Sequence, residues 1–225
     1  MKPLAFAAAL TAATPALAET GLFLAWPKQP ASSVHQWEET AAASLQDAAC
    51  RLHRSGTLSA SLGPLDWPQM QGFRLYRCAS PVLASLAASG APAALAHHGH
   101  PPVLVEGSLT LFPADAPGAE AEYIVKLSHY NNLNAPRRTD DLAALGSAIA
   151  ELENVWQTEA VLAPSTALGT LRPDDVTFLY YRTGAEAEAF RAANPGVLEQ
   201  VGRFNKAHLT AFTYLGATVQ SQPVN

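Results

Sequence analysis

The sequence lacks the short motifs that identify the common enzyme classes. It has no G-x-S-x-G nucleophile elbow, no H-E-x-x-H zinc motif, no G-x-G-x-x-G turn and no phosphate-binding P-loop. A Ser/His/Asp triad assembled from distant positions stays open, because such triads follow geometry and not spacing. We recognise no known family in these residues.

Charge is also scarce, and its sign limits the expected partners. Charged residues make up 15% of the chain, and the formal net charge is −5. An acidic surface repels a phosphate backbone, so we expect no nucleic acid partner and no adsorption to anionic membranes. The hydrophobic content of 48% indicates a packed globule and not a disordered chain.

Long apolar runs are absent, but the first residues carry an export pattern. Lys2 precedes the apolar run Leu4–Leu10, and Ala16-Leu17-Ala18 ends the segment with small residues. This order is typical of a secretory signal peptide, and the run is far shorter than the roughly 20 apolar residues that span a bilayer. We therefore expect a cleaved signal peptide over 1–18, one domain over 19–225, a periplasmic or secreted location and no integral membrane segment.

Cysteine is limited to Cys50 and Cys78, which lie 28 positions apart. An even number of cysteines in an exported protein predicts a disulfide, and the C-x-x-C spacing of a redox pair is absent. The alternative is a redox pair or a metal thiolate site. We predict a structural disulfide that contributes about 3 kcal/mol to stability.

A helix is predicted over residues 33–54, where apolar residues recur at three- and four-residue steps. Cys50 points away from the centre of this apolar stripe. The strand-like segment 73–78 is therefore expected to cover the outer face of the helix. Several Gly and Pro residues predict that 56–72 is mostly loop.

The order of the later elements predicts the fold class. Residues 103–112 and 122–130 are typical of two strands that form a hairpin. Strand pairs that alternate with helices favour an α+β fold, with a mostly antiparallel sheet, helices packed on one face, and a single compact domain. No domain linker and no internal repeat is visible. The other predicted elements are a strand at 21–26, a helix that starts at Ser80-Pro81 and ends at Gly90, a helix after Thr139, strands at 155–162 and 176–181, a helix at 185–193, a turn or helix at 195–204, and a final strand at 209–219.

Three histidines within four residues form the first candidate site. Neutral imidazole suits borderline divalent metals, so His97, His98 and His100 predict a Cu or Zn site, and Gly99 allows the necessary bend. The alternative is a solvated connector, because no carboxylate or thiol lies beside the histidines.

The segment 129–138 is the second candidate, a ligand-binding loop rich in hydrogen-bonding groups. Its two arginines are able to hold a carboxylate or phosphate bidentately. The alternative, which is favoured, is that the arginines pair with nearby aspartates and the asparagines shape the turn. The candidate ligand-binding residues are His129, Tyr130, Asn131, Asn132, Asn134, Arg137 and Arg138.

Aromatic residues of the C-terminal half form a third group that is able to line a pocket. Aromatic residues at strand positions usually serve sheet packing, and that interpretation comes first. The pair Asp174 and Asp175 is expected in an exposed turn. The aromatic group consists of Trp156, Tyr180, Tyr181, Phe204, Phe212 and Tyr214.

Three functional hypotheses follow from the sequence. The first is an exported, non-enzymatic binding or accessory protein of the cell envelope, whose partner is an envelope protein or a small ligand. The second is a periplasmic Cu/Zn-binding or metal-delivery protein that uses His97, His98 and His100. The third is a hydrolase-like or other enzyme with an unrecognised active site. The absence of catalytic motifs favours the first.

Overall fold

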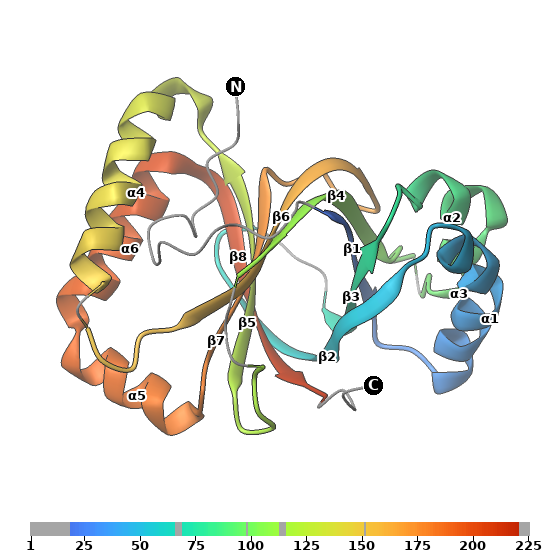
Figure 1. Ribbon diagram of the computed structural model, residues 1–225, viewed down its shortest axis with the longest axis horizontal. Helices are drawn as coiled ribbons and strands as arrows, with labels where there is room; N and C mark the ends of the chain where they lie inside the picture. Colours follow the sequence, from blue (N-terminus) through green and yellow to red (C-terminus); the bar gives the residue numbers. More distant parts are fainter. Residues whose placement is uncertain (1–18, 66–68, 98, 113–115, 151, 221–225) are drawn as a thin grey trace.

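The computed structural model describes residues 19–65, 69–97, 99–112, 116–150 and 152–220. In these residues eight strands close into one antiparallel barrel, in the order β1-β3-β2-β8-β5-β7-β6-β4 (Figure 1). The strands are β1 (Glu19–Pro27), β2 (Arg51–Leu62), β3 (Met70–Cys78), β4 (Val103–Leu111), β5 (Glu122–Tyr130), β6 (Gln157–Leu168), β7 (Asp175–Tyr181) and β8 (Leu209–Val219). The helices are α1 (Ala31–Asp47), α2 (Leu83–Ser89), α3 (Ala91–Ala94), α4 (Ala135–Ile149), α5 (Gly184–Ala193) and α6 (Pro195–His208), with a short 3-10 helix η2 (Asn132–Asn134).

The order of elements repeats once along the chain. The elements from β1 to β4 form a β-α-β-β-α-β unit, and those from β5 to β8 form a second one. Each unit contributes four adjacent strands, in the equivalent orders β4-β1-β3-β2 and β8-β5-β7-β6. The two units join through the pairs β2–β8 and β4–β6. The barrel is therefore built from two ferredoxin-like units.

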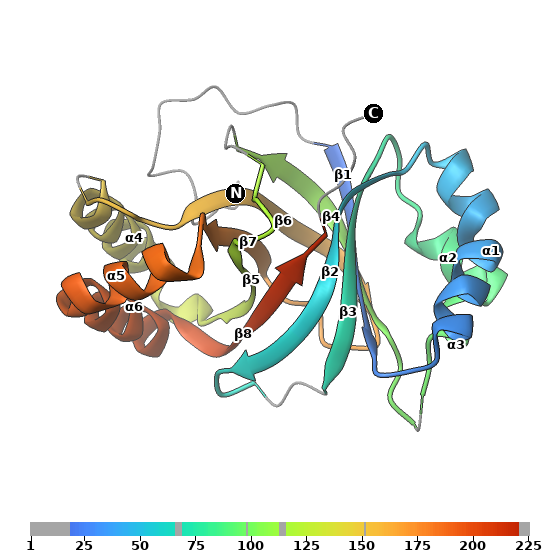
Figure 2. The same cartoon turned by 90° about the horizontal axis from the view of Figure 1, so that it is seen from below.

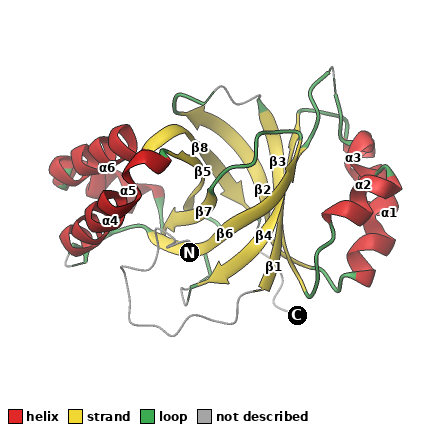
Figure 3. Cartoon of the chain, turned by 90° about the horizontal axis from the view of Figure 1, so that it is seen from above, coloured by secondary structure: helices red, strands yellow, loops and turns green. Residues whose placement is uncertain are grey.

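The helices cover two opposite sides of the barrel (Figure 2). Helices α1 to α3 pack on the outer face of the first unit through fully buried residues such as Trp37 and Leu86. Helices α4 to α6 pack on the second unit through residues that include Leu145 and Phe190. Figure 3 shows these two helical layers with the strands between them.

The barrel interior is a third apolar cluster, and strand alternation explains it. Along β5, Tyr123, Val125 and Leu127 point inward, while Ile124 and Lys126 face helices α4 to α6. The predicted strand over 122–130 is confirmed. Each strand of the second unit thus has one face in the barrel core and one face beneath a helical layer.

The predicted fold class is wrong, because the sheet closes on itself and carries helices on two sides. The predicted hairpin between 103–112 and 122–130 is also wrong. Strand β4 pairs with β1 and β6, whereas β5 pairs with β7 and β8. The reason is that β4 ends one unit and β5 begins the next: β4 pairs with β1 of its own unit and with β6 across a joint, and β5 pairs with two strands of its own unit.

The predicted helix over 33–54 is too long. Helix α1 ends at Asp47, and Ala49 has a left-handed φ of 49°, a conformation that stops a helix. The predicted loop over 56–72 is too long, because residues 56–62 belong to strand β2 and residues 70–72 to strand β3. Gly56 marks a close approach and not a turn, since a Cβ there would lie 2.4 Å from the backbone oxygen of Thr218.

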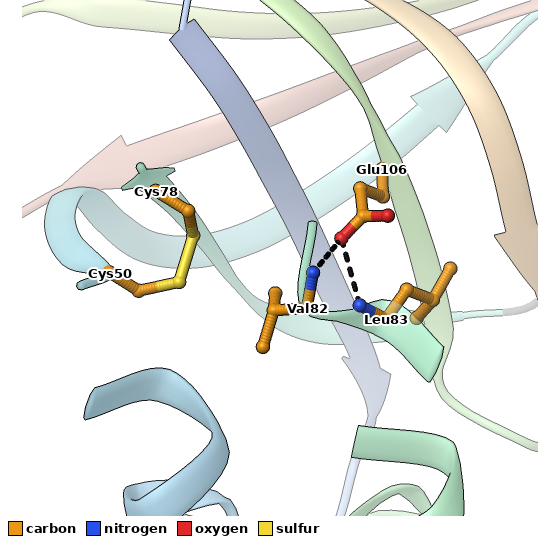
Figure 4. Close-up of a disulfide and its surroundings, with 5 residues drawn as sticks. All are labelled: Cys50, Cys78, Val82, Leu83 and Glu106. Atoms are coloured by element: carbon orange, nitrogen blue, oxygen red, sulfur yellow. Dashed lines mark hydrogen bonds between the residues drawn. A yellow bond between two sulfur atoms is a disulfide. The ribbon is translucent and has the colours of Figure 1, made fainter. Parts of the chain in front are cut away.

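The predicted disulfide between Cys50 and Cys78 is confirmed (Figure 4). It joins the residue before β2 to the last residue of β3, two neighbouring strands, and not a strand to a helix face. Close to it, the buried Glu106 accepts hydrogen bonds from the backbone N–H groups of Val82 and Leu83 (Figure 4). Glu106 thereby satisfies two of the free donors at the start of α2.

Among the described residues, no helix combines the length and the apolar character that a membrane crossing requires. The predicted signal peptide, residues 1–18, lies outside the described residues. Export and the periplasmic or secreted location therefore remain predictions.

Candidate functional site

A pocket of about 460 Å³ lies between the outer face of β5, β7 and β8 and helices α5 and α6. We call it the interlayer pocket. Its walls are mainly apolar, as is usual for small-molecule sites. The apolar lining residues are Leu62, Ile124, Trp156, Leu179, Leu198 and Val201.

Two glycines leave room for this pocket. Gly202 of α6 and Gly216 of β8 both line it. A Cβ at Gly202 would meet no atom within 4 Å, and one at Gly216 would meet only the Ser59 hydroxyl, at 3.1 Å. Neither position requires glycine for a left-handed φ. A glycine inside a helix lowers stability by about 1 kcal/mol relative to alanine. Gly202 therefore makes α6 less stable, and its missing side chain leaves the pocket open.

The polar end of the pocket consists of Lys126, Asn205 and Tyr214. Lys126 and Asn205 are each only 5% exposed. Lys126 Nζ donates to Asn205 Oδ1 at 3.3 Å, and Asn205 Nδ2 donates to the Tyr214 hydroxyl at 2.9 Å. Lys126 Nζ also lies 5.4 Å from the centre of the Tyr214 ring. These three side chains form a connected hydrogen-bonding group inside an apolar wall.

A bidentate ion pair stands elsewhere in the lining. Arg191 of α5 donates to the two carboxylate oxygens of Glu122 at 2.7 and 3.0 Å. The Arg191 guanidinium lies 5.8 Å from the centre of the Tyr181 ring. Burial raises the pKa of Tyr181 to about 12, against the opposing charge of Arg191, so this phenol stays protonated at neutral pH.

A buried acid lies beside the cross-strand partner of Lys126. Lys126 is in register with Thr177, two residues from Asp175 on the same face of β7. The Asp175 carboxylate accepts a hydrogen bond from the Tyr130 hydroxyl. Burial raises the pKa of Asp175 above its ordinary value, although the positive charge of Lys126 acts in the opposite direction. Asp175 is 5% exposed, so the expectation of an exposed turn is wrong for this residue.

The equivalent space in the first unit is filled. There, side chains of α1 to α3 pack directly on the sheet, and the centres of the Trp37 and Tyr76 rings lie 6.1 Å apart. The two units share a topology and differ in this layer.

The predicted ligand-binding loop lies at the far end of β5 and the start of α4. Asn131 Oδ1 accepts from the backbone N–H of Leu133 and shapes the turn, while Arg137 pairs with Asp141 at 3.5 Å. Arg138 lies over the Tyr130 ring, 4.1 Å from its centre. The contacts of Asn131 and Arg137 agree with the favoured alternative, whereas Arg138 contacts an aromatic ring and not an aspartate. A ligand-binding role for these residues, and for His129, Asn132 and Asn134, stays a prediction.

The backbone groups of His97 and His100 exchange hydrogen bonds of 3.0 and 2.9 Å. His98 lies outside the described residues. In the part of the chain that the structure describes, no three His, Cys, Asp or Glu side chains gather as a metal site would require. The Cu or Zn site stays a prediction.

The residues of the aromatic group lie in different parts of the structure. Trp156, Tyr181 and Tyr214 line the interlayer pocket, and Phe204 lines a smaller cavity of about 250 Å³ between α4 and α6. Tyr180 packs in the barrel interior. Sequence reasoning missed Lys126 and Asn205. The one available signal was Lys126, a charge within the apolar strand 122–130.

No family model matches this sequence, and no curated protein matches it. Solved structures with the same fold are nevertheless found. A chlorite dismutase from Candidatus Nitrospira defluvii, in complex with imidazole, is 11% identical with a TM-score of 0.56, over 92% of this chain and 93% of that chain. An anthrone oxidase-like protein is 14% identical with a TM-score of 0.50, over 90% and 93% of the two chains. A protein assigned as a monooxygenase from Fusobacterium nucleatum is 8% identical with a TM-score of 0.50, over 92% and 94%.

Likeness at such low identity shows a shared fold, here the two-unit α+β barrel. It also contradicts our first functional hypothesis. The three structures named above are described as a chlorite dismutase, an anthrone oxidase-like protein and a monooxygenase, not as binding proteins of the cell envelope. That hypothesis is therefore abandoned.

Proposed function

We propose that this protein is an enzyme that oxidises a small, largely apolar and aromatic molecule in the interlayer pocket. The observation that carries the proposal is the pocket itself, an apolar space of about 460 Å³ with one cluster of polar side chains. The class of reaction is taken from the structural neighbours, two of which are an anthrone oxidase-like protein and a protein assigned as a monooxygenase.

We propose dioxygen as the oxidant. A substrate with an activated CH2 group supplies all the electrons that reduce it, so no further reductant is needed. An activated CH2 group becomes a carbonyl when it gains one oxygen atom and loses two hydrogens. The second oxygen atom leaves as water with both hydrogens, and four electrons pass from carbon to oxygen. The residues of the pocket then bind and orient the substrate and exclude water from it.

Haem is the cofactor that oxidative chemistry commonly uses, and the pocket residues do not fit it. Haem iron takes axial ligands from His, Cys, Met or Tyr side chains. The residues that line the pocket include no histidine, cysteine or methionine. The hydroxyl of Tyr214 is already bonded to Asn205, and burial keeps Tyr181 protonated. We therefore derive no step through haem.

Oxygen uptake by the purified protein tests the proposal. Anthrone, a flat aromatic ketone whose activated CH2 group loses a proton to give an enolate oxyanion, is a suitable first substrate. We expect saturable oxygen consumption, with one oxygen molecule used per anthrone. Gly202→Leu places a side chain in the pocket and should lower kcat/KM at least about tenfold, since lost alignment of the reacting groups is costly.

The matched control is Gly196→Leu, which makes the same change in the same helix at a position outside the pocket lining. A Cβ at Gly196 also meets no atom within 4 Å. This variant should keep the wild-type rate. The proposal fails if no member of a series of such aromatic ketones and phenols supports oxygen uptake. It also fails if both leucine variants retain the full rate.

A further inference from the structure

We infer that Lys126, Asn205 and Tyr214 form an oxyanion site, and that the molecule bound in the interlayer pocket is an apolar monoanion held by its charged oxygen. This inference rests on the proposed function, because it names the substrate class of the same pocket. It concerns binding only, so its test does not depend on the oxidation.

The direction of the hydrogen bonds supports an acceptor as the ligand group. A lysine ammonium only donates, so the Asn205 side-chain oxygen must face Lys126. The Asn205 NH2 group must then face Tyr214, whose hydroxyl oxygen accepts its hydrogen bond. The Tyr214 hydroxyl hydrogen is thereby directed away from Asn205. Among the described residues, it meets no hydrogen-bond acceptor. Lys126 and Tyr214 are consequently both donors at this end of the pocket.

The charges around the pocket favour an anion at the same end. Glu122, the acidic residue of the lining, is held by Arg191 in a bidentate pair. The buried Asp175 lies outside the lining, and its carboxylate accepts from Tyr130. Lys126 is thus a cationic group of the lining that lies beside the apolar wall, in addition to Arg191.

Burial makes this arrangement selective. Lys126 is 5% exposed, so water screens its charge weakly. A hydrogen bond to a charged group is roughly twice as strong as one between neutral groups. A neutral ligand of the same shape would gain the apolar contacts and lose most of the interaction with Lys126. Charge, rather than shape, should therefore decide which flat aromatic molecules bind tightly.

A pair of matched probes tests the inference by titration calorimetry at neutral pH. 2-Naphthoate and 2-naphthamide share one ring system and differ in charge. We expect 2-naphthoate to bind about 10- to 100-fold more tightly, the range that a charge-assisted hydrogen bond gives. Lys126→Met, which keeps the apolar stem, should reduce this ratio to near one. Tyr214→Phe, which removes only the hydroxyl, should reduce it partly and guards against failure of the lysine variant to fold.

The outcomes separate this inference from the proposed function. Equal affinity for the two probes in the wild type, or an unchanged ratio in both variants, overturns the oxyanion site and leaves the pocket. Equal affinity of Gly202→Leu and Gly196→Leu for 2-naphthoate would instead place binding elsewhere and remove the proposed function. Tight binding of the naphthoate that is lost in Gly202→Leu, with the ratio lost in Lys126→Met, supports both.

Discussion

The Tyr123 hydroxyl donates a hydrogen bond of 2.5 Å to Glu159, although the two residues belong to strands that are not neighbours. Tyr123 lies on β5 and Glu159 on β6, with β7 between them. Arg54 of β2 donates to the other carboxylate oxygen, and His53 Nε2 lies 3.2 Å from that oxygen. Glu159 therefore links three strands of the two units at one end of the barrel.

Glu159→Gln should lower the stability of the protein at neutral pH. It should also make the free energy of unfolding fall less steeply in acid. Burial would raise the pKa of Glu159, but the contacts from His53 and Arg54 outweigh it and lower the pKa to about 2, against an ordinary value of 4.5. The fold thus favours the ionised form. Its contribution of about 3 kcal/mol is present above pH 4.5 or so and disappears as the pH falls towards about 2. Urea unfolding of both proteins across this range measures the effect.

The matched control is Glu19→Gln, which breaks the partly exposed pair with Arg77. Exposed pairs contribute at most about 1 kcal/mol. A loss in Glu159→Gln no larger than in Glu19→Gln would contradict the structural role of the barrel-end cluster.

Asp175→Asn should have the opposite pH signature. Burial raises the pKa of Asp175 above its ordinary value of 3.8, so the folded state favours the protonated form. Stability of the wild type therefore falls as the pH rises from about 3.8 through the folded-state pKa. An asparagine removes this slope, because its amide does not titrate and its oxygen still accepts from Tyr130. The two unfolding free energies should lie closest in acid, where Asp175 is protonated and resembles the amide, and should diverge towards neutral pH as the wild type loses stability; parallel curves would contradict this prediction.

Removal of the disulfide should cost stability and leave the fold intact. The double variant Cys50→Ala/Cys78→Ala opens a loop of 28 residues. Restriction of the unfolded chain by a loop of this size is worth about 3 to 4 kcal/mol. Guanidinium unfolding, with and without a thiol reductant, checks this prediction: the reductant should weaken the wild type and have no effect on the variant. A wild type that does not respond to full reduction would contradict it.

Two glycine substitutions should change stability in opposite directions. Gly202→Ala lies in a helix and meets no neighbour, so it should raise the unfolding free energy by about 1 kcal/mol. Gly56→Ala would place its Cβ 2.4 Å from the Thr218 oxygen and should lower it by about 1 to 3 kcal/mol. Thermal unfolding of the two variants gives the signs directly. A loss of stability in Gly202→Ala would show that the glycine serves packing and not the pocket.

The sequence predicted individual elements better than their arrangement. The residue pattern in 122–130 predicted strand β5, and the cysteine count predicted the disulfide. Strand β2 was missed, because Gly56 is required by a contact with β8 that is remote in sequence. Barrel closure was also out of reach, since the joints β2–β8 and β4–β6 connect segments that carry no local signal of their pairing.

The candidate site was predicted only in part. Trp156, Tyr181 and Tyr214 were named as possible pocket residues, yet sheet packing was preferred because aromatic residues on strands usually serve it. Nothing local in the sequence brings Asn205 of α6 to Lys126 of β5, which lies 79 positions earlier. The pocket also depends on Gly202, a residue that contributes only by having no side chain. Such a site can be found only from the three-dimensional packing of the helices on the sheet.

Tryptophan fluorescence during a titration with 2-naphthoate tests the central claim, that the interlayer pocket binds the substrate. Trp156 lines this pocket, and the chain has three other tryptophans, so Trp156→Phe isolates its signal. We predict saturable quenching in the wild type, loss of most of that quenching in Trp156→Phe with unchanged calorimetric affinity within about threefold, and no saturable quenching in Gly202→Leu. Equal quenching in the wild type and in Trp156→Phe would place the ligand elsewhere and contradict the account.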